Sequence, residues 1–231
     1  MIALLDSLES CIRKLKYKQQ KTEWGNYYND TNYTSEGFEH KKQLISSFLD
    51  KLKPKTVWDI GSNTGIFSRI ASEKLIDTLS FDSDPLAVQK NYLQCKPSHA
   101  ENLLPLLLDI TNPSPGIGWD NKERKSLRER CKADTVMALA LIHHLSISNN
   151  LPFAMVSEYF SKICNSLIIE FVPKDDSQVQ RLLASRKDIF TDYSKVNFEN
   201  SFTQFFTILE QTPIKDSKRT LYMMEQKQSN I

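Results

Sequence analysis

The segment Val57–Ala71 constrains the fold of this 231-residue chain more than any other part of the sequence. It begins with the apolar run Val57–Ile60, continues through the small-residue turn Gly61–Gly65, and ends in the helical pattern Ile66–Ala71. Small residues in such a turn allow backbone N–H groups and a helix N-terminus to approach a ligand closely. The segment therefore predicts a buried strand, a tight turn and a helix that together bind a nucleotide-type cofactor.

Two glycine patterns compete for this turn. A dinucleotide loop requires Gly-x-Gly-x-x-Gly, but that register places Asn63 and Ile66 where glycines are needed. The second pattern is an acidic residue followed by glycines at alternating positions, and it fits Asp59, Gly61 and Gly65, with Asn63 at the central glycine position. This resembles the first motif of class I S-adenosylmethionine-dependent methyltransferases. Asparagine tolerates the left-handed backbone region better than most residues, so the turn can survive the substitution.

The order of apolar runs predicts the fold class. Helical patterns separate five short runs, which indicates βαβ units and a parallel sheet. Two final runs have a connection too short for a helix, so they should pair antiparallel. The predicted strands are Thr56–Ile60, Thr78–Phe81, Leu104–Leu108, Thr135–Ala140, Leu167–Phe171, Phe205–Leu209 and Arg219–Met224. This is an α/β, Rossmann-like, doubly wound, mostly parallel seven-stranded sheet with a C-terminal antiparallel hairpin, the strand inventory of the class I methyltransferases.

Residues 1–53 are expected to form an N-terminal helical extension and lid, and residues 54–231 the S-adenosylmethionine-binding methyltransferase domain. Apolar residues from Leu5 to Leu15 recur at helical spacing, beside a basic run from Arg13 to Lys21. That run is either a solvated helix face or a phosphate-binding patch. The aromatic and amide-rich segment Trp24–Tyr33 suits a lid that excludes water, although a local hydrophobic cluster would have a similar composition.

Charge and cysteine content exclude several classes of protein. The 30 basic and 28 acidic residues give a formal charge of +2, which carries no global signal of nucleic-acid binding. The four cysteines form no Cys-x-x-Cys pair, and His40 and His99 show no metal-ligand spacing with other histidines. No apolar run is long enough for a signal peptide or a membrane span. We expect a cytoplasmic protein without a metal site or membrane association.

The resemblance implies roles for the strand ends. Asp59 would lie near the amino group of the methionine moiety, Asp82 would accept the ribose hydroxyls, and Asp109 would recognise the adenine amino group. A helix cap at Asp82 and an ordinary turn at Asp109 are the structural alternatives. The full set of expected cofactor-binding residues is Tyr33, Lys41, Asp59, Gly61, Ser62, Asn63, Gly65, Asp82, Ser83, Asp109, Ile110 and Ala138.

Catalytic candidates follow the fourth and fifth predicted strands. The segment Ile142–Leu145 resembles a Leu-His-His motif of small-molecule methyltransferases, and His143 is the favoured general base because neutral imidazole can take a proton from an attacking hydroxyl. A purely structural histidine pair is the alternative, and in-line positioning can suffice without any base. Glu170 is a second candidate, which either binds a ligand or pairs with a neighbour such as Lys174.

Five segments resemble a bacterial methyltransferase group that includes nodulation-type proteins: Trp24–Tyr33, Trp58–Gly65, Asn112–Trp119, Leu139–Leu145 and Glu170–Leu183. The resemblance implies S-adenosylmethionine-dependent methyl transfer to a small-molecule acceptor. An RNA methyltransferase and a non-catalytic methyltransferase-like binding protein are the alternatives. The insertion Asn112–Lys132 is expected to be a loop and a surface helix, in which Trp119 either lines a substrate pocket or anchors the loop.

Overall fold

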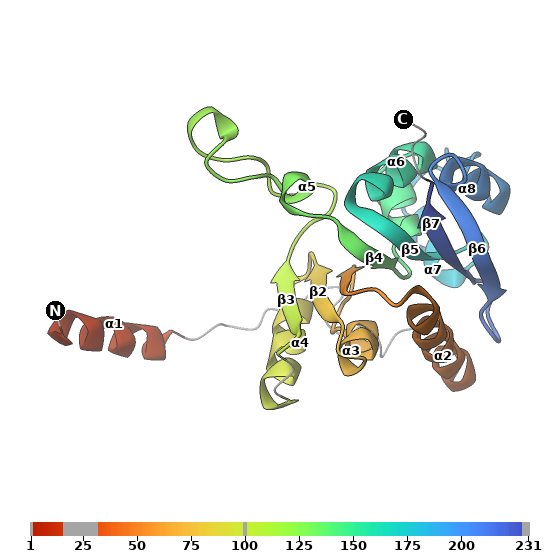
Figure 1. Cartoon of the computed structure of the whole chain (residues 1–231). Coiled ribbons are helices and arrows are strands. Elements are labelled where there is room, and N and C mark those ends of the chain that lie inside the picture. Colours follow the sequence, from red (N-terminus) through yellow and green to blue (C-terminus); the bar gives the residue numbers. More distant parts are fainter. Residues whose placement is uncertain (1, 16–31, 99–100, 228–231) are drawn as a thin grey trace.

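The computed structural model describes residues 2–15, 32–98 and 101–227. These residues form a seven-stranded sheet with the order β3-β2-β1-β4-β5-β7-β6 (Figure 1). The first five strands run parallel, and β7 lies antiparallel between β5 and β6. The strands are β1 (Thr56–Ile60), β2 (Asp77–Asp82), β3 (Leu103–Leu107), β4 (Ala133–Ala138), β5 (Cys164–Phe171), β6 (Phe206–Pro213) and β7 (Thr220–Gln226).

The predicted fold class is confirmed, including the C-terminal antiparallel hairpin. Most strand boundaries differ from the predicted ones by one to three residues. The largest difference lies in β6, which extends to Pro213, whereas the prediction ended it at Leu209. The predicted connection between β6 and β7 was therefore too long. The last residues of β6 are mostly polar, so the sequence shows no apolar run there, although the alternation of more and less buried side chains continues along the strand.

Helices flank the sheet, apart from α1, which buries none of its residues (Figure 1). The helices are α1 (Ile2–Lys14), α2 (Ser35–Leu52), α3 (Ile66–Glu73), α4 (Pro85–Ser98), α5 (Leu127–Arg130), α6 (Phe153–Ile163), α7 (Ser177–Ala184) and α8 (Lys195–Phe202), with a 3₁₀ turn η2 (Trp119–Asn121) and a π-helical turn η3 (His144–Ser148). No helix in the described part of the chain is both long and apolar enough to cross a membrane.

Apolar side chains cover both faces of the sheet. Consecutive side chains of a strand point to opposite faces, so the central strands contribute to an apolar cluster on each side. On β5, Leu167 and Ile169 belong to one apolar cluster and Ile168 to the other. The first cluster includes buried residues of α6 and α8, and the second includes buried residues of α2 and α3. Helix α2 therefore packs against the sheet, although it lies within the predicted extension 1–53. The boundary at residue 53 stays a prediction.

The order of the strands places a switch point between β1 and β4, which are neighbours although they are not consecutive. Connections from β1 lead toward β2 and β3, and connections from β4 lead toward β5 on the other side. At such a point the connecting segments diverge and leave a crevice at the carboxyl ends of the strands. The turn after β1 and the segment after β4 should therefore share one ligand site.

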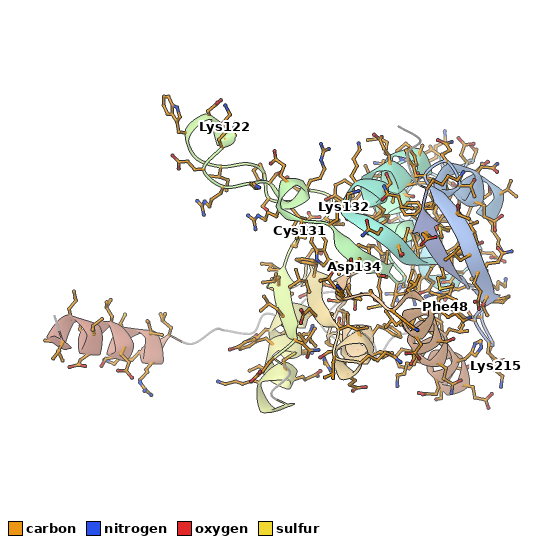
Figure 2. All side chains as sticks on the ribbon, viewed as in Figure 1. Phe48, Lys122, Cys131, Lys132, Asp134 and Lys215 are labelled. Atoms are coloured by element: carbon orange, nitrogen blue, oxygen red, sulfur yellow. The ribbon has the colours of Figure 1, made fainter. Side chains whose placement is uncertain are left out.

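The insertion between β3 and β4 forms an arm that extends away from the sheet, with Lys122 near its tip (Figure 2). Its side chains include Trp119, which is 86% exposed, so both predicted roles for Trp119 were wrong. Leu127 of α5 is instead the buried residue of the arm and packs into the core. A bridge between Ile117 and Arg124 orders the arm.

Candidate functional site

The turn after β1 has the left-handed backbone that its sequence predicted. The φ angles are 77° at Gly61, 50° at Asn63 and 75° at Gly65. Asn63 stabilises the turn with its own side chain, because its Oδ1 accepts the N–H of Thr64 at 2.9 Å. At Gly65 a side chain is excluded, since a Cβ would lie 2.4 Å from the amide of Asn91. Asparagine thus replaces one glycine of the motif, but Gly65 has no such substitute.

A buried set of polar side chains supports this turn, and we call Asp59, Ser62, Ser68, Ser80 and Asn91 the hydroxyl cluster. The Ser68 hydroxyl donates to Asp59 Oδ2 at 2.5 Å, and Ser80 donates to Ser62 Oγ at 2.7 Å. Asn91 donates to Ser80 Oγ at 2.8 Å. Burial raises the pKa of Asp59 to about 7, although the hydrogen bond from Ser68 acts in the opposite direction. The sequence had indicated only Asp59 and Ser62 of this set.

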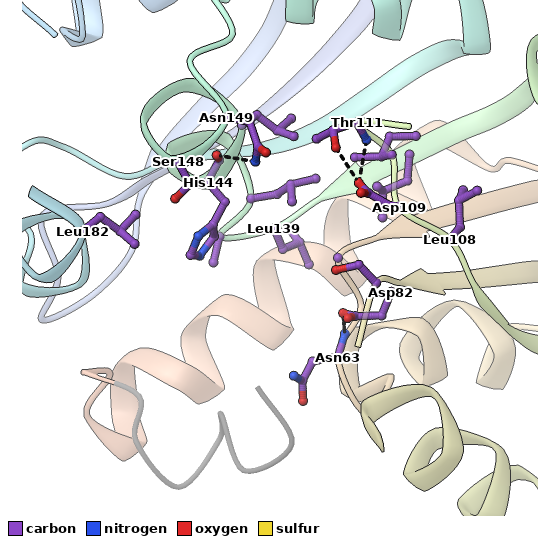
Figure 3. Close-up of a pocket in the computed structure, with 17 residues that line it drawn as sticks. Asn63, Asp82, Leu108, Asp109, Thr111, Leu139, His144, Ser148, Asn149 and Leu182 are labelled. Carbon is purple, nitrogen blue, oxygen red and sulfur yellow. Dashed lines mark hydrogen bonds between the residues drawn. The ribbon is translucent and has the colours of Figure 1, made fainter. Parts of the chain in front are cut away.

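A cavity of about 370 Å³ lies at the carboxyl ends of β1, β2 and β4, and we call it the switch-point cavity (Figure 3). The expected residues that line it are Gly61, Asn63, Asp82, Ser83, Asp109 and Ile110. Ser148, Asn149 and Leu182 also line it, although no sequence motif had indicated them. These residues come from η3, the segment after it and α7, which reach the cavity only through the tertiary fold.

Asp82 is the most enclosed acidic residue of this cavity, with 9% of its surface exposed. Its Oδ2 accepts the N–H of Asn63 at 2.7 Å and its Oδ1 the N–H of Asp84 at 2.8 Å. Each oxygen of a carboxylate has a second lone pair, so Asp82 can still accept ligand hydroxyls. Burial raises its pKa. The cap of α4 is Asp84, which accepts the N–H of Leu86, so Asp82 is free of the capping role.

Asp109 also lines the cavity, after the neighbouring strand β3, and is more exposed than Asp82. Its Oδ1 accepts both the N–H and the hydroxyl of Thr111, at 2.8 Å and 2.7 Å (Figure 3). This is the local turn geometry that the sequence offered as the alternative to ligand binding. Its Oδ2 has no hydrogen bond within the described residues, so a turn and a ligand contact are compatible.

A small cavity of about 30 Å³ adjoins the switch-point cavity, with Gly61 and Asn63 lining both. Four further expected residues line the small cavity: Tyr33, Lys41, Asp59 and Ser62. Two expected residues line neither cavity. Gly65 packs against Asn91, and Ala138 is completely buried in the core.

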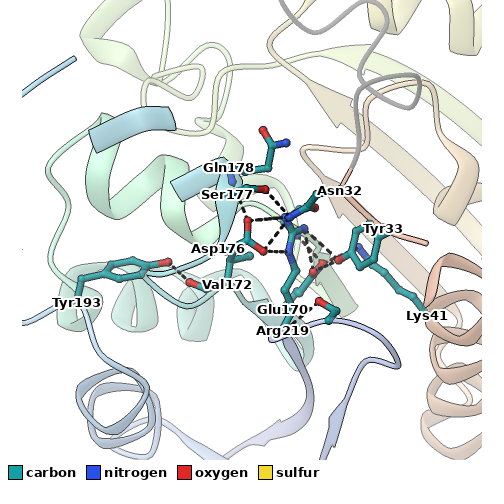
Figure 4. Close-up of polar contacts among 12 residues, drawn as sticks. Asn32, Tyr33, Lys41, Glu170, Val172, Asp176, Ser177, Gln178, Tyr193 and Arg219 are labelled. Carbon is teal, nitrogen blue, oxygen red and sulfur yellow. Dashed lines mark hydrogen bonds and ion pairs between the residues drawn. The ribbon is translucent and has the colours of Figure 1, made fainter. Parts of the chain in front are cut away.

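Charged side chains close the far side of the small cavity, and we call Tyr33, Lys41, Glu170, Asp176 and Arg219 the ionic cluster (Figure 4). Glu170 Oε2 accepts the Lys41 ammonium group at 2.5 Å, while its Oε1 accepts the Tyr33 hydroxyl and, at 3.3 Å, Arg219 Nη1. Arg219 also donates through Nε to Asp176 at 2.8 Å. Lys41, Glu170 and Arg219 are each at most 2% exposed.

The predicted pairing of Glu170 with Lys174 was wrong. Lys174 pairs with Asp188 at 2.7 Å instead. Burial acts to raise the pKa of Glu170, but the charges of Lys41 and Arg219 outweigh it, and the pKa lies below its usual value. The role of Arg219 was missed. The sequence feature that could have indicated this role is a single arginine at the start of an apolar strand, because a buried charge requires a partner.

The two histidines after β4 lie in different environments. His143 is 1% exposed, lines neither cavity, and its Nδ1 has no hydrogen-bond partner among the described residues. His144 lines the switch-point cavity, near Leu182 and Ser148 in Figure 3. Burial is the main cause that lowers the pKa of His144 to about 4, so its imidazole is neutral at pH 7. The geometry therefore brings His144, and not the favoured His143, to the cavity.

The expected lid lies mostly outside the described residues, which include only Asn32 and Tyr33 of Trp24–Tyr33. Both are held at the ionic cluster, where Asn32 Oδ1 accepts Arg219 Nη2 at 2.9 Å and the Tyr33 hydroxyl accepts Arg219 Nη1 at 3.1 Å. Of the basic run, Arg13 and Lys14 are described and exposed, and Arg13 pairs with Glu9. In the described part of the chain, no three histidine, cysteine or acidic side chains are grouped as a metal ion requires.

Comparisons with known proteins give one clear relative. No family model matches the chain. The chain is 40% identical over 225 residues to nodulation protein NoeA of Rhizobium meliloti (strain 1021), a match that covers 96% of the chain and 47% of NoeA. The chain thus spans about half the length of this relative.

Solved structures show the fold. Magnesium protoporphyrin IX methyltransferase (ChlM) from Synechocystis PCC 6803, with bound SAH, matches with a TM-score of 0.61 and 15% identity, over 88% of this chain and 92% of that one. N-methyltransferase NodS from Bradyrhizobium japonicum WM9 matches with a TM-score of 0.59 and 11% identity, over 84% and 98%. At these identities the similarity is one of architecture, and the acceptors of these enzymes are not transferable.

Proposed function

We propose that the chain, which has the fold of class I S-adenosylmethionine-dependent methyltransferases and is similar to about half of NoeA, transfers a methyl group from S-adenosylmethionine to a small, uncharged acceptor. The proposal rests first on one observation. Asp59 lines the small cavity, Asp82 and Asp109 line the adjoining switch-point cavity, and the three carboxylates follow the order of the neighbouring strands β1, β2 and β3. This order matches the amino, ribose and adenine groups along the cofactor.

The small cavity suits the amino acid end of the cofactor. Asp59 has a raised pKa because it is buried, and an ammonium group beside it would favour its ionised form. Lys41 and the hydroxyl of Tyr33 line the same cavity and complement a carboxylate. At the other end, Asp82 accepts the ribose hydroxyls and Ile110 packs against the adenine ring. Residues of the predicted extension 1–53, namely Tyr33 and Lys41, thereby cover the methionine moiety.

The residues that surround the reacting end favour an uncharged acceptor. No lysine or arginine lines the switch-point cavity among the residues that the structure describes, and η3, the segment after it and α7 contribute His144, Ser148, Asn149 and Leu182 to its wall. A nucleic-acid substrate requires cations beside its phosphates. We therefore favour a small molecule over RNA, the second candidate that the basic N-terminal run suggested.

His144 is the proposed general base for an acceptor that carries a hydroxyl or similar group. A lone pair of the acceptor attacks the methyl carbon, the carbon–sulfur bond breaks, and its electron pair stays on sulfur to give S-adenosylhomocysteine. The neutral imidazole of His144 takes the proton that the acceptor loses. Because the pKa of His144 lies at about 4, its gain in rate would be modest, and in-line positioning supplies most of the catalysis.

Calorimetry with S-adenosylmethionine and S-adenosylhomocysteine tests the cofactor site. We expect the wild type to bind both, and Asp82→Asn to weaken binding by about tenfold or more, because hydrogen bonds to a charged group contribute roughly 1.5–3 kcal/mol. The matched control is Asp50→Asn, which changes a carboxylate exposed on α2. Absence of binding to the wild type, or equal affinity of the two variants, would contradict the proposal.

Formation of S-adenosylhomocysteine with neutral acceptors then separates an enzyme from a binding protein. His144→Ala should keep the cofactor affinity and show a modest reduction in turnover, while an unchanged turnover removes the general-base role. Cofactor binding without turnover on any acceptor would favour the non-catalytic alternative. Gel-shift affinity for RNA that falls steeply with salt would favour the RNA alternative.

A further inference from the structure

The π-helical turn η3 separates the switch-point cavity from a second cavity of about 450 Å³. His144 and Ser148 line the first of these cavities, and Ser146 lines the second. The next two residues continue the division, with Asn149 at the switch-point cavity and Asn150 at the second. A π-helical turn is rare in proteins and is frequently found at functional sites. One short element thus forms a wall of both cavities.

The size of the switch-point cavity leaves little room beyond the cofactor. Its volume of about 370 Å³ lies near the lower end of the range for a site that holds one small ligand. An acceptor can place its reacting group at this cavity beside His144, but its remaining atoms must lie elsewhere. The second cavity offers such a space on the other side of η3.

The lining of the second cavity combines aromatic rings, neutral polar groups and one carboxylate, that of Asp192. Phe153, Phe190 and Tyr193 supply the rings, and Phe153 and Tyr193 pack with their centroids 5.1 Å apart. Asn150 and Asn197 supply amides. Within the part of the chain that the structure describes, no lysine or arginine lines this cavity. Phosphates and carboxylates would therefore lack a cationic partner there.

One buried group in the wall lacks a partner. Ser146 is 7% exposed, and its hydroxyl makes no hydrogen bond within the described residues. A buried hydroxyl without a partner is costly, so such groups usually bind water or a ligand. Two exposed groups are also available, since the amide nitrogen of Asn150 and the amide oxygen of Asn197 have no partner among the described residues.

Other contacts hold this wall in place. Arg186 donates to the backbone carbonyl of Ile147 in η3 and, at 3.0 Å, to Asn150 Oδ1. The Tyr193 hydroxyl donates to the carbonyl of Val172 at 2.7 Å, and Asn197 Nδ2 donates to the carbonyl of Asp192 at 3.0 Å. The ring and both amides are thus oriented before any ligand arrives, which lowers the entropy cost of binding.

We propose that the second cavity binds a neutral ring that carries several hydroxyl groups, as in a pyranose, and that this ring is the non-reacting part of the acceptor. Amides both donate and accept hydrogen bonds, as hydroxyl groups do, and aromatic rings complement the apolar C–H face of such a ring. The assignment as part of the acceptor rests on the proposed methyl transfer. The binding of the ring itself can be measured independently.

Saturation-transfer NMR on the full chain tests the assignment with methyl glucopyranoside, methyl mannopyranoside and N-acetylglucosamine as probes. We expect millimolar binding of at least one of them, weakened about three- to tenfold in Asn197→Ala, since one neutral hydrogen bond contributes about 0.5–1.5 kcal/mol. Phe190→Ala should weaken the same probe through loss of the ring contact. Gln204→Ala, an exposed amide that does not line the cavity, is the matched control and should bind as the wild type does.

Three results would overturn the assignment: no saturation transfer to any sugar probe, equal binding by wild type and Asn197→Ala, or stronger binding of benzyl alcohol or glucose 6-phosphate than of the neutral sugars. Calorimetry with S-adenosylmethionine on the same samples keeps the two proposals apart. Cofactor binding without sugar binding refutes only the proposal that the second cavity binds a hydroxylated ring. Sugar binding without cofactor binding refutes the methyltransferase function and leaves the ring assignment in place.

Discussion

The hydroxyl cluster and the ionic cluster both contribute side chains to the lining of the small cavity, but they are built in opposite ways. In the hydroxyl cluster, Asp59 and Ser68 are nine positions apart, and Asn91 reaches Ser80 across eleven. The ionic cluster joins Lys41 to Glu170 across 129 positions and Tyr33 to Arg219 across 186. The first cluster therefore shapes one turn, while the second holds together segments from both ends of the chain.

The two clusters also differ in their charge. Asp59 is the only ionisable group of the hydroxyl cluster, and burial raises its pKa, so the cluster favours the neutral state. In the ionic cluster, the pKa values of Glu170 and Asp176 are lowered because Lys41 and Arg219 lie beside them, although burial acts in the opposite direction. A local neutral cluster should tolerate substitution, whereas a distant, buried, charged cluster should fail when one member is removed.

The largest expected effect is the loss of Arg219. Arg219→Met leaves Glu170 and Asp176 buried with fewer partners, and removing one member of a buried charge network typically costs about 3–5 kcal/mol. Urea unfolding should show this loss in the free energy of unfolding. Arg219→Lys should recover part of it, because the charge returns without the fork that contacts several partners. If Arg219→Met lowers the free energy of unfolding by less than about 1 kcal/mol, the ionic cluster stabilises the protein no more than an exposed ion pair does, and the prediction is wrong.

The second effect is a difference in pH dependence. In the folded protein Asp59 binds its proton up to about pH 7, whereas the unfolded chain releases it near its ordinary pKa of 3.8. The stability linked to Asp59 is therefore lost as the pH rises from about 4 to about 7, by at most about 1.4 kcal/mol per pH unit. Glu170 and Asp176 act in the opposite sense, since their contribution is present above their ordinary pKa values and is lost as the pH falls below them.

Urea unfolding midpoints across this pH range check the prediction. Between about pH 4 and about pH 7 the free energy of unfolding of the wild type should fall relative to that of Asp59→Asn, while the lowered pKa of His144, which acts in the opposite sense, contributes equally to both proteins. Both proteins should lose stability in acid, because the ionic cluster is intact in each. Asp50→Asn serves again as the exposed control. Parallel pH profiles of the wild type and Asp59→Asn would show that Asp59 is not linked to stability in this range.

The smallest expected effect is at Asn63. Asn63→Gly relieves the left-handed backbone at φ 50°, but it removes the side-chain acceptor for the Thr64 N–H and increases the freedom of the unfolded chain. These terms oppose each other, so the free energy of unfolding and the cofactor affinity should change by less than about 1 kcal/mol. Asn63→Val should be clearly destabilised, since a β-branched residue is strained at positive φ. Equal stability of Asn63→Gly and Asn63→Val would refute this account.

The sequence was most informative where a residue type depends on local backbone geometry. The left-handed turn around Asn63 was predicted from neighbouring residues, and the structure has it. Predictions failed where the partner was remote. Glu170 was expected either to bind a ligand or to pair with a neighbour such as Lys174, because the chain gives no indication that Lys41 and Arg219 are its partners.

The sequence by itself determined the sheet, its terminal hairpin and the turn that follows β1, because hydrophobic periodicity and glycine geometry act over a few residues. Only the tertiary structure decided that His144 rather than His143 reaches the switch-point cavity, that Arg219 closes the ionic cluster, and that η3 forms a wall of two cavities. These features depend on the direction of side chains across elements that the fold brings together. No local pattern encodes such a direction, since burial and pairing are properties of the packed molecule.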